Sequence, residues 1–597
     1  MESQFELRVD DDNKAVEMSF RPSAFWSRHE GVHMRGFCGG TISLFLAFFA
    51  WFAMAPIALD MMHSISLCEN ERFPPEEYPT RYAFMVYTSL ETGESYCRYG
   101  KVLDSDGHVE DCVDPPEGSS GRRLSSSSSS ESTSESTASS SSASSSVIVA
   151  EGYVGYSSEK YNAEVLPKCV CGPETHCWRM LLLAGALSIF SGALGTLVLG
   201  NVLENFGPIQ TLAGVLVIAS LGLNFQMGIW DEGSLLASSI LLGFTGSAIP
   251  IVQFWCGQMF SPSIMGTVSA TTSGWGNLGA GMAQLIMVFV VMEPLVHLGL
   301  PFDTAWRFSL IIPMLLVLEC SRSITNWCSD TPVGRYRSRV TTTPLQRHVE
   351  LLRCLIDPRV LALGYQYACC FGVELVMNTI LTTHFRTYFQ MDLELACVMG
   401  GSFGLVNLFG RSLGGWVSDR LFALFGFKGR LWFHAGIFIF EAIAMVTFSK
   451  EHSDQPWELV LSTLVVFSLS VQMAEGSTFA ILPRIMPTRT LAVERVVSAL
   501  GNIGAAVALL TIYKFYGKSD PMHPFEIHAY FVCPASLLTI FCVCPDPLPK
   551  EEADMEGEGS FKFVPDVSEK EANPKDSPEV QVPEEEVRLQ SPKPTRI

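Results

Sequence analysis

The sequence predicts an all-α membrane protein with twelve transmembrane helices in two six-helix halves, and three observations support this. Apolar residues make up 48% of the 597 residues and charged residues only 17%, a composition typical of a chain surrounded by lipid. Apolar stretches of about 20 residues, which is long enough to span a bilayer, recur from Phe37 to Pro545. Residue patterns of the first half also reappear in the second.

Hydropathy gives the order of the segments. Spans are expected near residues 37–59, 179–200, 209–229, 233–256, 264–292, 304–322, 360–382, 394–414, 431–449, 457–482, 496–516 and 525–545. They divide the chain into a cytoplasmic N-terminal segment (1–36), helix 1 (37–59), an extracellular loop rich in Ser and bearing Cys (60–178), helices 2 to 6 (179–322), a cytoplasmic middle loop (323–359), helices 7 to 12 (360–545) and a disordered acidic cytoplasmic tail (546–597).

Lys and Arg collect in alternate loops, and this predicts the orientation. Short cytoplasmic loops carry an excess of both residues. Arg is frequent in the N-terminal segment, in the middle loop, and after helices 8 and 10, where Arg495 is counted with the loop. Both termini are therefore predicted to be cytoplasmic. The first 30 residues are polar and lack the apolar run of a signal peptide, so insertion is expected to begin with helix 1.

The formal charge of −21 lies mostly outside the predicted spans, in residues 60–177 and in the tail after Asp546. Net charge therefore says little about a substrate. The loop contains the tract SSSSSSESTSESTASSSSASSS from Ser125 onward. Such a tract cannot bury enough apolar area to offset chain entropy, so it is expected to be disordered, as is the acidic, Pro-rich tail.

The 17 cysteines fall into two groups. Most lie in apolar runs, where a thiol acts as a small apolar group; Cys369, Cys370 and Cys542 are examples. Six lie in the first long loop, an even number that fits disulfides in an oxidising compartment, with about fifteen possible pairings. These six are Cys68, Cys97, Cys112, Cys169, Cys171 and Cys177.

Two matched patterns indicate an internal repeat of the kind found in two-half transporters. In each pattern of the first pair, a Gly follows four residues and an acid eight residues after the first position. These patterns are Thr196-Gly200-Glu204 in helix 2 and Arg411-Gly415-Asp419 in helix 8. The second pair is Gly276-Asn277-Leu278-Gly279 in helix 5 and Gly501-Asn502-Ile503-Gly504 in helix 11.

Ionisable groups inside a bilayer are costly unless they are paired or hydrated, so they are functional candidates. Arg411 lies in the middle of helix 8, and its planar guanidinium suits the oxygens of a trigonal oxyanion. Alternatively, Arg411 pairs with Glu374 on helix 7 or Glu475 on helix 10 and locks the halves together. The two glutamates could instead carry protons, cap helices or form ion pairs, and Glu475 could lie near enough to the cytoplasmic end to be solvated.

The glycine-rich runs of helices 5 and 11 contain a second set of candidates. Small residues such as Gly276, Gly279 and Gly501 let neighbouring helices approach closely. Asn277 and Asn502 could hydrogen-bond either the partner helix or a bound anion. Aromatic residues could also wall a cavity, and Tyr367 is the best of them because its hydroxyl needs a partner. The others are Phe48, Phe49, Trp51, Phe52 and Tyr365.

Several blocks of sequence resemble one transporter family. They are Met34-Arg-Gly-Phe37, Gln253-Phe-Trp255, Gly274-Trp-Gly-Asn-Leu-Gly-Ala-Gly281 with Gln284-Leu-Ile-Met287, Gly372-Val-Glu-Leu375, Phe403-Gly-Leu-Val-Asn407, Gly429-Arg-Leu-Trp432 and Thr478-Phe-Ala-Ile-Leu-Pro483. By these blocks the chain is identified as a divergent member of the nitrate/nitrite porter family of the major facilitator superfamily. The resemblance covers nearly all of the hydrophobic region.

The resemblance implies two arginines that grip the anion, one on helix 2 and one on helix 8. Arg411 matches the helix 8 arginine. The helix 2 position falls on Thr196, so half of the expected positive charge is missing there. Ala280 also replaces a Gly in helix 5, and the long Ser-rich loop after helix 1 is not a usual feature of the family.

The predicted function is secondary active transport of nitrate, with nitrite as a further substrate, by alternating access. The resemblance implies coupling to protons and a plasma-membrane location, although an internal membrane is an alternative. A non-transporting membrane sensor or scaffold and a porter of another small anion are the other readings. No enzyme motif, metal-ligand cluster or phosphate-binding loop is visible, so no catalysis, cofactor or nucleic-acid partner is expected. The sequence does not identify any accessory membrane protein.

Overall fold

The computed structural model describes residues 13–16, 18, 31–65, 67, 171–172, 175–261, 264–300, 302–334, 336, 344–486, 489–517 and 520–542, with five short strands between residues 86 and 124. The Ser-rich tract and the acidic tail, both predicted to be disordered, lie outside these residues. The strands are β1 (Val86–Thr88), β2 (Ser95–Cys97), β3 (Lys101–Leu103), β4 (Val109–Val113) and β5 (Arg122–Leu124). They pair antiparallel in the order β1-β2-β5-β4-β3, and the sequence analysis did not predict them.

Twelve helical segments of the described chain are long and apolar enough to cross a membrane, which confirms the predicted fold class. They are Val32–Met62, His176–Phe206, Pro208–Met227, Glu232–Met259, Thr267–His297, Thr304–Trp327, Pro358–Thr387, Leu393–Phe425, Phe427–Phe448, Trp457–Ile485, Thr490–Phe515 and His523–Cys542. The eleventh segment begins at Thr490 rather than near 496. Arg495, counted with a loop in the sequence analysis, is therefore part of a helix.

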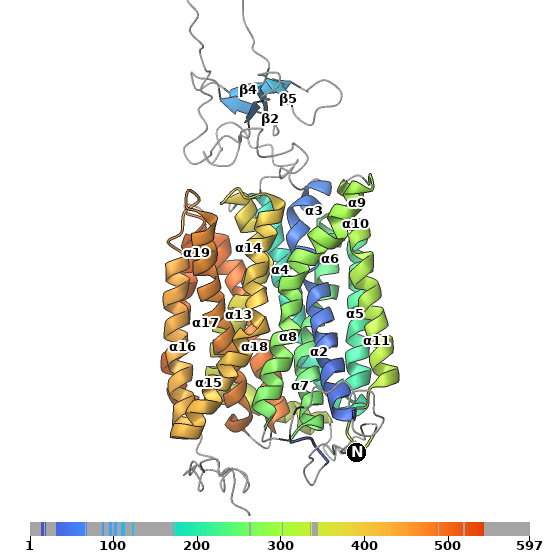
Figure 1. Ribbon diagram of the computed structural model, residues 1–597, viewed down its shortest axis with the longest axis vertical. Helices are drawn as coiled ribbons and strands as arrows, with labels where there is room; N and C mark the ends of the chain where they lie inside the picture. Colours follow the sequence, from blue (N-terminus) through green and yellow to red (C-terminus); the bar gives the residue numbers. More distant parts are fainter. Residues whose placement is uncertain are drawn as a thin grey trace, which may run out of the picture.

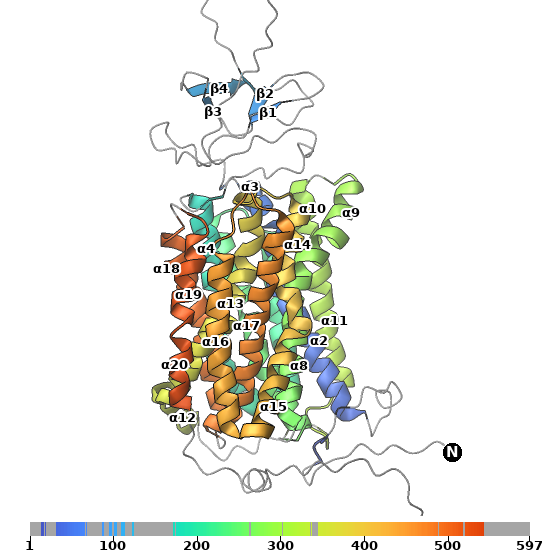
Figure 2. The same cartoon turned by 60° about the vertical axis from the view of Figure 1, so that its left-hand side comes forward.

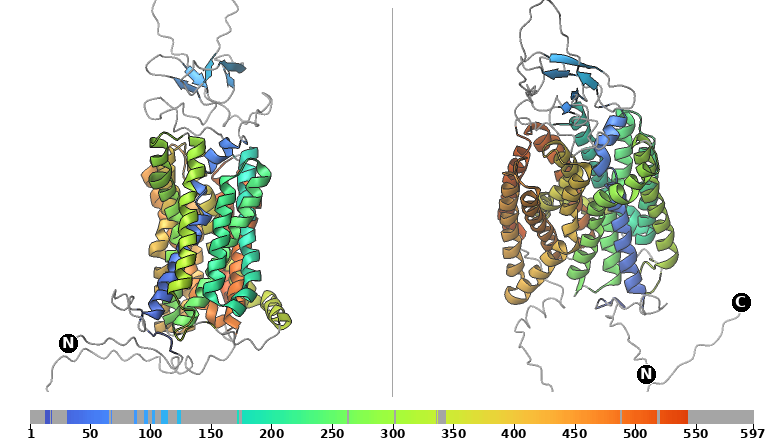
Figure 3. Two further views of the ribbon diagram at one scale, coloured as in Figure 1. Left: turned by 90° about the vertical axis from the view of Figure 1, so that its right-hand side faces the viewer. Right: turned by 45° about the horizontal axis from the view of Figure 1, so that its top comes forward.

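The two halves of the chain form two groups of helices that lie side by side (Figures 1 and 3). The first group consists of α2 (Val32–Trp51), η1 (Ala55–Ile57), α3 (Ala58–Ser64), α4 (His176–Phe206), α5 (Pro208–Met227), α6 (Glu232–Gly243), η3 (Phe244–Ser247), α7 (Ala248–Met259), α8 (Met265–Leu285), η5 (Ile286–Met292), α9 (Glu293–His297), α10 (Phe302–Ser309) and α11 (Ile311–Trp327).

The second group begins with α12 (Pro344–Ile356), a short helix at the end of the bundle opposite the β-sheet (Figure 2). The spans that follow are formed by α13 (Pro358–Thr387), α14 (Leu393–Leu405), η6 (Val406–Leu408), α15 (Gly410–Phe425), α16 (Phe427–Phe448), α17 (Trp457–Ile485), α18 (Thr490–Phe515), α19 (His523–Val532), α20 (Ala535–Leu538) and η8 (Thr539–Cys542).

Several spans change their helical geometry within the membrane. The eighth span is interrupted by the 3₁₀ turn η6, which ends at Leu408, and Phe409 leaves the α-helical conformation before α15 starts at Gly410. The fifth span contains the π-helical segment η5. Such turns inside a helix redirect side chains and are frequent at functional positions. In the eighth span the interruption lies directly before Arg411.

Two seams of small residues join the halves. Along the first, α8 faces α14 and α15, and a Cβ added to Gly404 would lie 2.6 Å from the backbone N and Cα of Gly281. Along the second, α4 faces α18, and Gly192 of α4 lies close to Asn502 of α18. Such close approach of backbones is the usual role of small residues between membrane helices.

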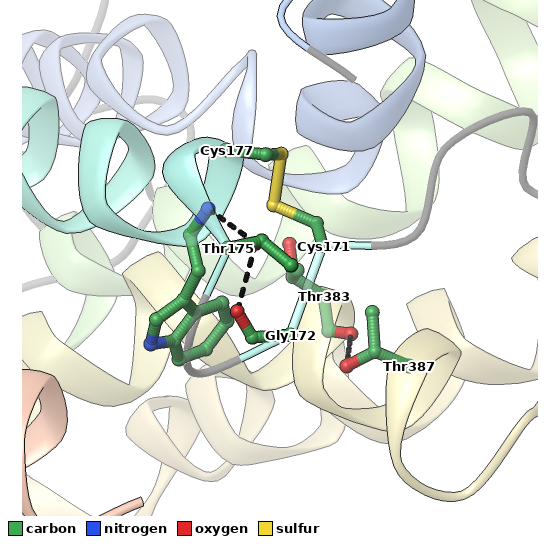
Figure 4. Close-up of a disulfide and its surroundings, with 7 residues drawn as sticks. Cys171, Gly172, Thr175, Cys177, Thr383 and Thr387 are labelled. Carbon is green, nitrogen blue, oxygen red and sulfur yellow. Dashed lines mark hydrogen bonds between the residues drawn. A yellow bond between two sulfur atoms is a disulfide. The ribbon is translucent and has the colours of Figure 1, made fainter. Parts of the chain in front are cut away.

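A disulfide and an ion pair lie near the end of the bundle that faces the β-sheet. Cys171 and Cys177 are bonded at the start of α4, beside Thr383 of α13 (Figure 4). Asp60 of α3 accepts a hydrogen bond from Arg386 of α13 at 2.8 Å, and both side chains are buried. This pair links the two halves. The side chains of the other four loop cysteines lie outside the described residues.

The contact between Gly404 and Gly281 predicts that Gly404→Ala destabilises the protein. The added methyl group would meet backbone atoms that cannot rotate away, and overpacking of this kind costs about 1–3 kcal/mol. Gly436→Ala in α16 is the matched control, since nothing lies within 4 Å of its added Cβ. Thermal unfolding of the purified variants should show a lower Tm for Gly404→Ala alone. Equal Tm values would contradict the proposed backbone contact.

Candidate functional site

A buried charged cluster lies between the halves, centred on Arg411 of α15. The side chain is 0% exposed, as are those of Glu374 on α13 and Glu475 on α17. One guanidinium nitrogen, Nη2, lies 3.2 Å from Oε2 of Glu374 and also pairs with Oε2 of Glu475. Arg411 therefore contacts both carboxylates at once. Glu475 is fully buried and not solvated, because α17 continues to Ile485 beyond it.

The Glu374 carboxylate is held by donors from several elements. Asn277 of α8 donates its side-chain Nδ2–H to Oε2 at 2.9 Å, and Asn407 of η6 donates to Oε1 at 2.5 Å. With Arg411 this makes three donors and fits an ionised carboxylate, which only accepts hydrogen bonds. Asn407 was quoted only within a sequence block and was missed as a site residue. Its position beside the interruption of the eighth span was the available signal.

Several buried donors of the cluster have no hydrogen-bond acceptor among the described residues. Nε and Nη1 of Arg411 and the hydroxyl of Tyr367 are buried and have no hydrogen-bond partner within the described part of the chain. A buried donor without a partner costs about 1–3 kcal/mol. Tyr367 stacks on Phe371 with ring centroids 4.8 Å apart, and Phe479 packs against the rings and the guanidinium. Donors and aromatic walls of this kind suit a small planar anion.

The charges of the cluster do not balance. One guanidinium faces two carboxylates, so the cluster carries one net negative charge when all three groups are ionised. At an effective dielectric constant near 20, an anion about 5 Å from an unpaired carboxylate is repelled by about 3 kcal/mol. Anion binding is therefore favoured when one carboxylate is protonated or moves away.

Asn502 and Thr196 lie on the seam between α4 and α18, whereas Gly501 lies on the face of α18 toward α13. Asn502 donates Nδ2–H to the carbonyl of Ser498 in its own helix at 2.9 Å, and its buried Oδ1 has no hydrogen-bond partner among the described residues. Thr196 is 1% exposed and donates its hydroxyl to the carbonyl of Gly192. Gly501 packs against the ring of Tyr367. Within the described part of the chain, none of the three hydrogen-bonds to Arg411 or Glu374, whereas Asn277 joins the cluster through Glu374.

Three of the candidate residues lie away from the cluster. Gly276 and Gly279 pack against Leu44 and the Phe45 backbone of α2, so they serve helix packing. Tyr365 is 36% exposed and donates to the carbonyl of Phe531, because its position on α13 faces α19 and not the cluster.

The aromatic residues of helix 1 fall into two sets. Trp51 and Phe52 line a cavity of about 90 Å³ with Ser188 and Thr379. Phe48 and Phe49 are buried in the packed core. Among the described residues there is no group of three or more His, Cys, Asp or Glu side chains that could hold a metal ion.

Known proteins share both the sequence and the fold. The profile of the Major Facilitator Superfamily matches residues 179–512. The high affinity nitrate transporter 2.5 of Arabidopsis thaliana is 30% identical over 338 residues, which are 55% of this chain and 66% of that protein. The high-affinity nitrate transporter 2.3 of Oryza sativa subsp. japonica is 29% identical over 56% of this chain and 64% of its own length. The chain thus spans just under two thirds of these two relatives.

Two more distant proteins agree with this result. The nitrate/nitrite transporter NrtP of a Picosynechococcus species is 22% identical over 53% of this chain and 74% of that protein. The crystal structure of the human organic anion transporter MFSD10 (TETRAN) matches with a TM-score of 0.50 at 10% identity, covering 85% of this chain and 99% of that one; this likeness concerns the fold alone.

These relatives confirm the predicted resemblance to nitrate/nitrite porters, and all are named as transporters, in line with the expectation that the chain is not an enzyme. The profile match covers more than half of the chain, and the twelve spans have the expected arrangement. This multi-pass membrane protein therefore belongs to the major facilitator superfamily.

Proposed function

We propose that this chain carries nitrate, with nitrite as a second substrate, across a membrane by alternating access. The observation that carries the proposal is the fully buried guanidinium of Arg411, which lies between the halves with two donor nitrogens, Nε and Nη1, that have no partner among the described residues. A trigonal oxyanion can accept hydrogen bonds from both donors in one plane. The similarity to proteins named as nitrate transporters supports the same class of substrate.

The charge of the cluster supports proton coupling. Glu475 contacts Arg411 and has no other hydrogen-bond donor among the described residues, whereas Glu374 accepts from three donors. We therefore assign the coupled proton to Glu475. Its protonation removes the excess negative charge and releases part of the guanidinium for the anion. Binding of the proton and binding of the anion then favour each other.

The location follows only from the resemblance to the porter family. We place the protein in the plasma membrane with both termini in the cytoplasm, so that anion and proton enter together. Localisation of a tagged full-length chain by microscopy tests this placement independently of transport.

Replacement of Arg411 by Ala should abolish saturable nitrate uptake. Loss of two charge-assisted hydrogen bonds of about 1.5 kcal/mol or more each predicts an affinity at least about 100-fold weaker. Uptake of labelled nitrate and nitrite into proteoliposomes containing the full-length chain measures this. Arg420→Ala is the matched control, because Arg420 lies on the same helix with an exposed side chain over Trp416.

Uptake by the unmodified chain distinguishes the proposed function from its alternatives. If it moves neither anion under any imposed gradient, the proposal is wrong, and a sensor, a scaffold or a porter of another small anion remains. If Arg411→Ala transports as well as the unmodified chain, the anion does not bind at this cluster.

The two glutamates of the Arg411 cluster should make transport depend on pH. In the unmodified chain the apparent affinity for nitrate should fall as the pH rises, because ionised carboxylates repel the anion. Glu475→Gln removes one negative charge at every pH, so binding of nitrate should lose most of this dependence, and an inward proton gradient should no longer accelerate uptake. Glu526→Gln is the control, since Glu526 pairs with Lys450 near an end of the bundle.

Glu374→Gln separates the two carboxylates. It should disturb the contacts of Asn277 and Asn407 as well as the charge, and so lower the maximal rate in addition to changing the pH profile. Proton-stimulated uptake that persists in both glutamine variants would contradict coupling through this cluster.

A further inference from the structure

The internal repeat relates positions on the two seams. In the first repeated pattern, Thr196 corresponds to Arg411, and Gly200 corresponds to Gly415 at the same sequence separation. In the second pattern, Asn277 corresponds to Asn502, and Ala270 corresponds to Arg495 at the same sequence separation. The seam between α8 and α15 should therefore contain a contact equivalent to one between α4 and α18. The two contacts to compare are Gly415 with Ala270, and Gly200 with Arg495.

The structure contains both contacts. A Cβ added to Gly415 would lie 3.1 Å from the Cβ of Ala270, and a Cβ added to Gly200 would fall on the guanidinium of Arg495. The two seams thus have the same geometry but carry their charge differently. One has Arg411 on α15 packed against Gly274 of α8, with Gly415 against Ala270 one turn further along. The other has Thr196 on α4 opposite Arg495 on α18. Each seam therefore contains one arginine. In the seam between α8 and α15 it lies on α15, the equivalent of α4, and in the seam between α4 and α18 it lies on α18, the equivalent of α8.

The guanidinium of Arg495 lies against α4, the helix on which the repeat would place an arginine. Its Nε donates to the carbonyl of Thr196 at 3.4 Å, and its Nη2 donates to the carbonyl of Leu197. The residue is only 4% exposed although α18 is one of the membrane-spanning helices. A buried arginine within a span is costly unless it is paired or hydrated, and such a residue is therefore a functional candidate.

Tyr367 connects this position to the cluster around Arg411. Its ring packs against Gly501 on α18, six residues after Arg495. Arg495 therefore lies about 9 Å along the same helix from this aromatic wall, on the side toward the beginning of α18.

We propose that Arg495 is a second anion-binding arginine, which supplies from α18 the guanidinium that the repeat would place at position 196 of α4. This inference rests on the proposed function. In the closed state, carbonyl oxygens of α4 hold the guanidinium. When α4 and α18 separate at this end, the guanidinium loses these acceptors, and the anion leaving Arg411 takes their place.

Moving the arginine back across the seam tests the inference. The full-length chain is compared with Arg495→Ala and with the double variant Thr196→Arg/Arg495→Ala in proteoliposomes, by KM and maximal rate of nitrate uptake and by nitrate-dependent thermal shift. Arg495→Ala should raise KM about tenfold or more, the effect of one lost charge-assisted hydrogen bond. The double variant should recover most of that loss. Arg420→Ala again serves as the control.

The outcomes separate the inference from the proposed function. If the unmodified chain binds nitrate and Arg495→Ala keeps the same KM, the inference is wrong while the proposed function stands. A changed maximal rate with unchanged KM, or a raised KM that the double variant does not recover, would likewise overturn it and leave Arg495 as a latch between helices. If the unmodified chain neither binds nor transports nitrate, the proposed function itself fails. Thermal unfolding without nitrate shows that each variant is folded.

Discussion

The ion pair between Arg411 and Glu374 is the constraint on which the middle of the protein depends. Burying an unpaired charge costs several kcal/mol, and removal of one partner of a buried pair is similarly costly. The structure meets this constraint with amide donors from α8 and η6. The interruption of the eighth span directly before Arg411 brings Asn407 to the carboxylate, and the approach of α8 brings Asn277. The hydrogen bond from Asn277 to Glu374 therefore both stabilises the buried charges and joins the two halves.

The seams explain how such a contact can also open. Glycines allow backbones to meet without interlocking large side chains, as at Gly281 and Gly404. Polar links between the halves lie near each end of the bundle: Asp60 with Arg386 at one end, and Arg495 with carbonyl groups of α4 at the other. The alternating access proposed above would require one link to break while the other persists.

Hydropathy was sufficient for the number and order of the spans, because each has to cover the hydrophobic thickness of a bilayer. A charge within a span singled out Arg411, and the repeat singled out Asn277 and Asn502; all three stay predicted site residues. The repeat could not show that Gly276 and Gly279 pack on α2, since that depends on which face of α8 is turned inward. Arg495 was missed for a related reason. A charged residue lowers the hydropathy near the end of a span, so Arg495 was assigned to a loop. Its contact with α4 nevertheless buries it.

The two carboxylates also bear on the energy of transport. With one bound proton the loaded cluster would carry the same charge as the empty one, so a membrane potential would not favour import. With a proton on both Glu374 and Glu475, the loaded cluster would be neutral while the empty one is negative. One positive charge would then enter with each anion, and a potential negative inside would contribute about 2.3 kcal/mol per 100 mV. Under the proposed function, a second protonatable glutamate would therefore let the membrane potential contribute to import, which a single protonated carboxylate would not.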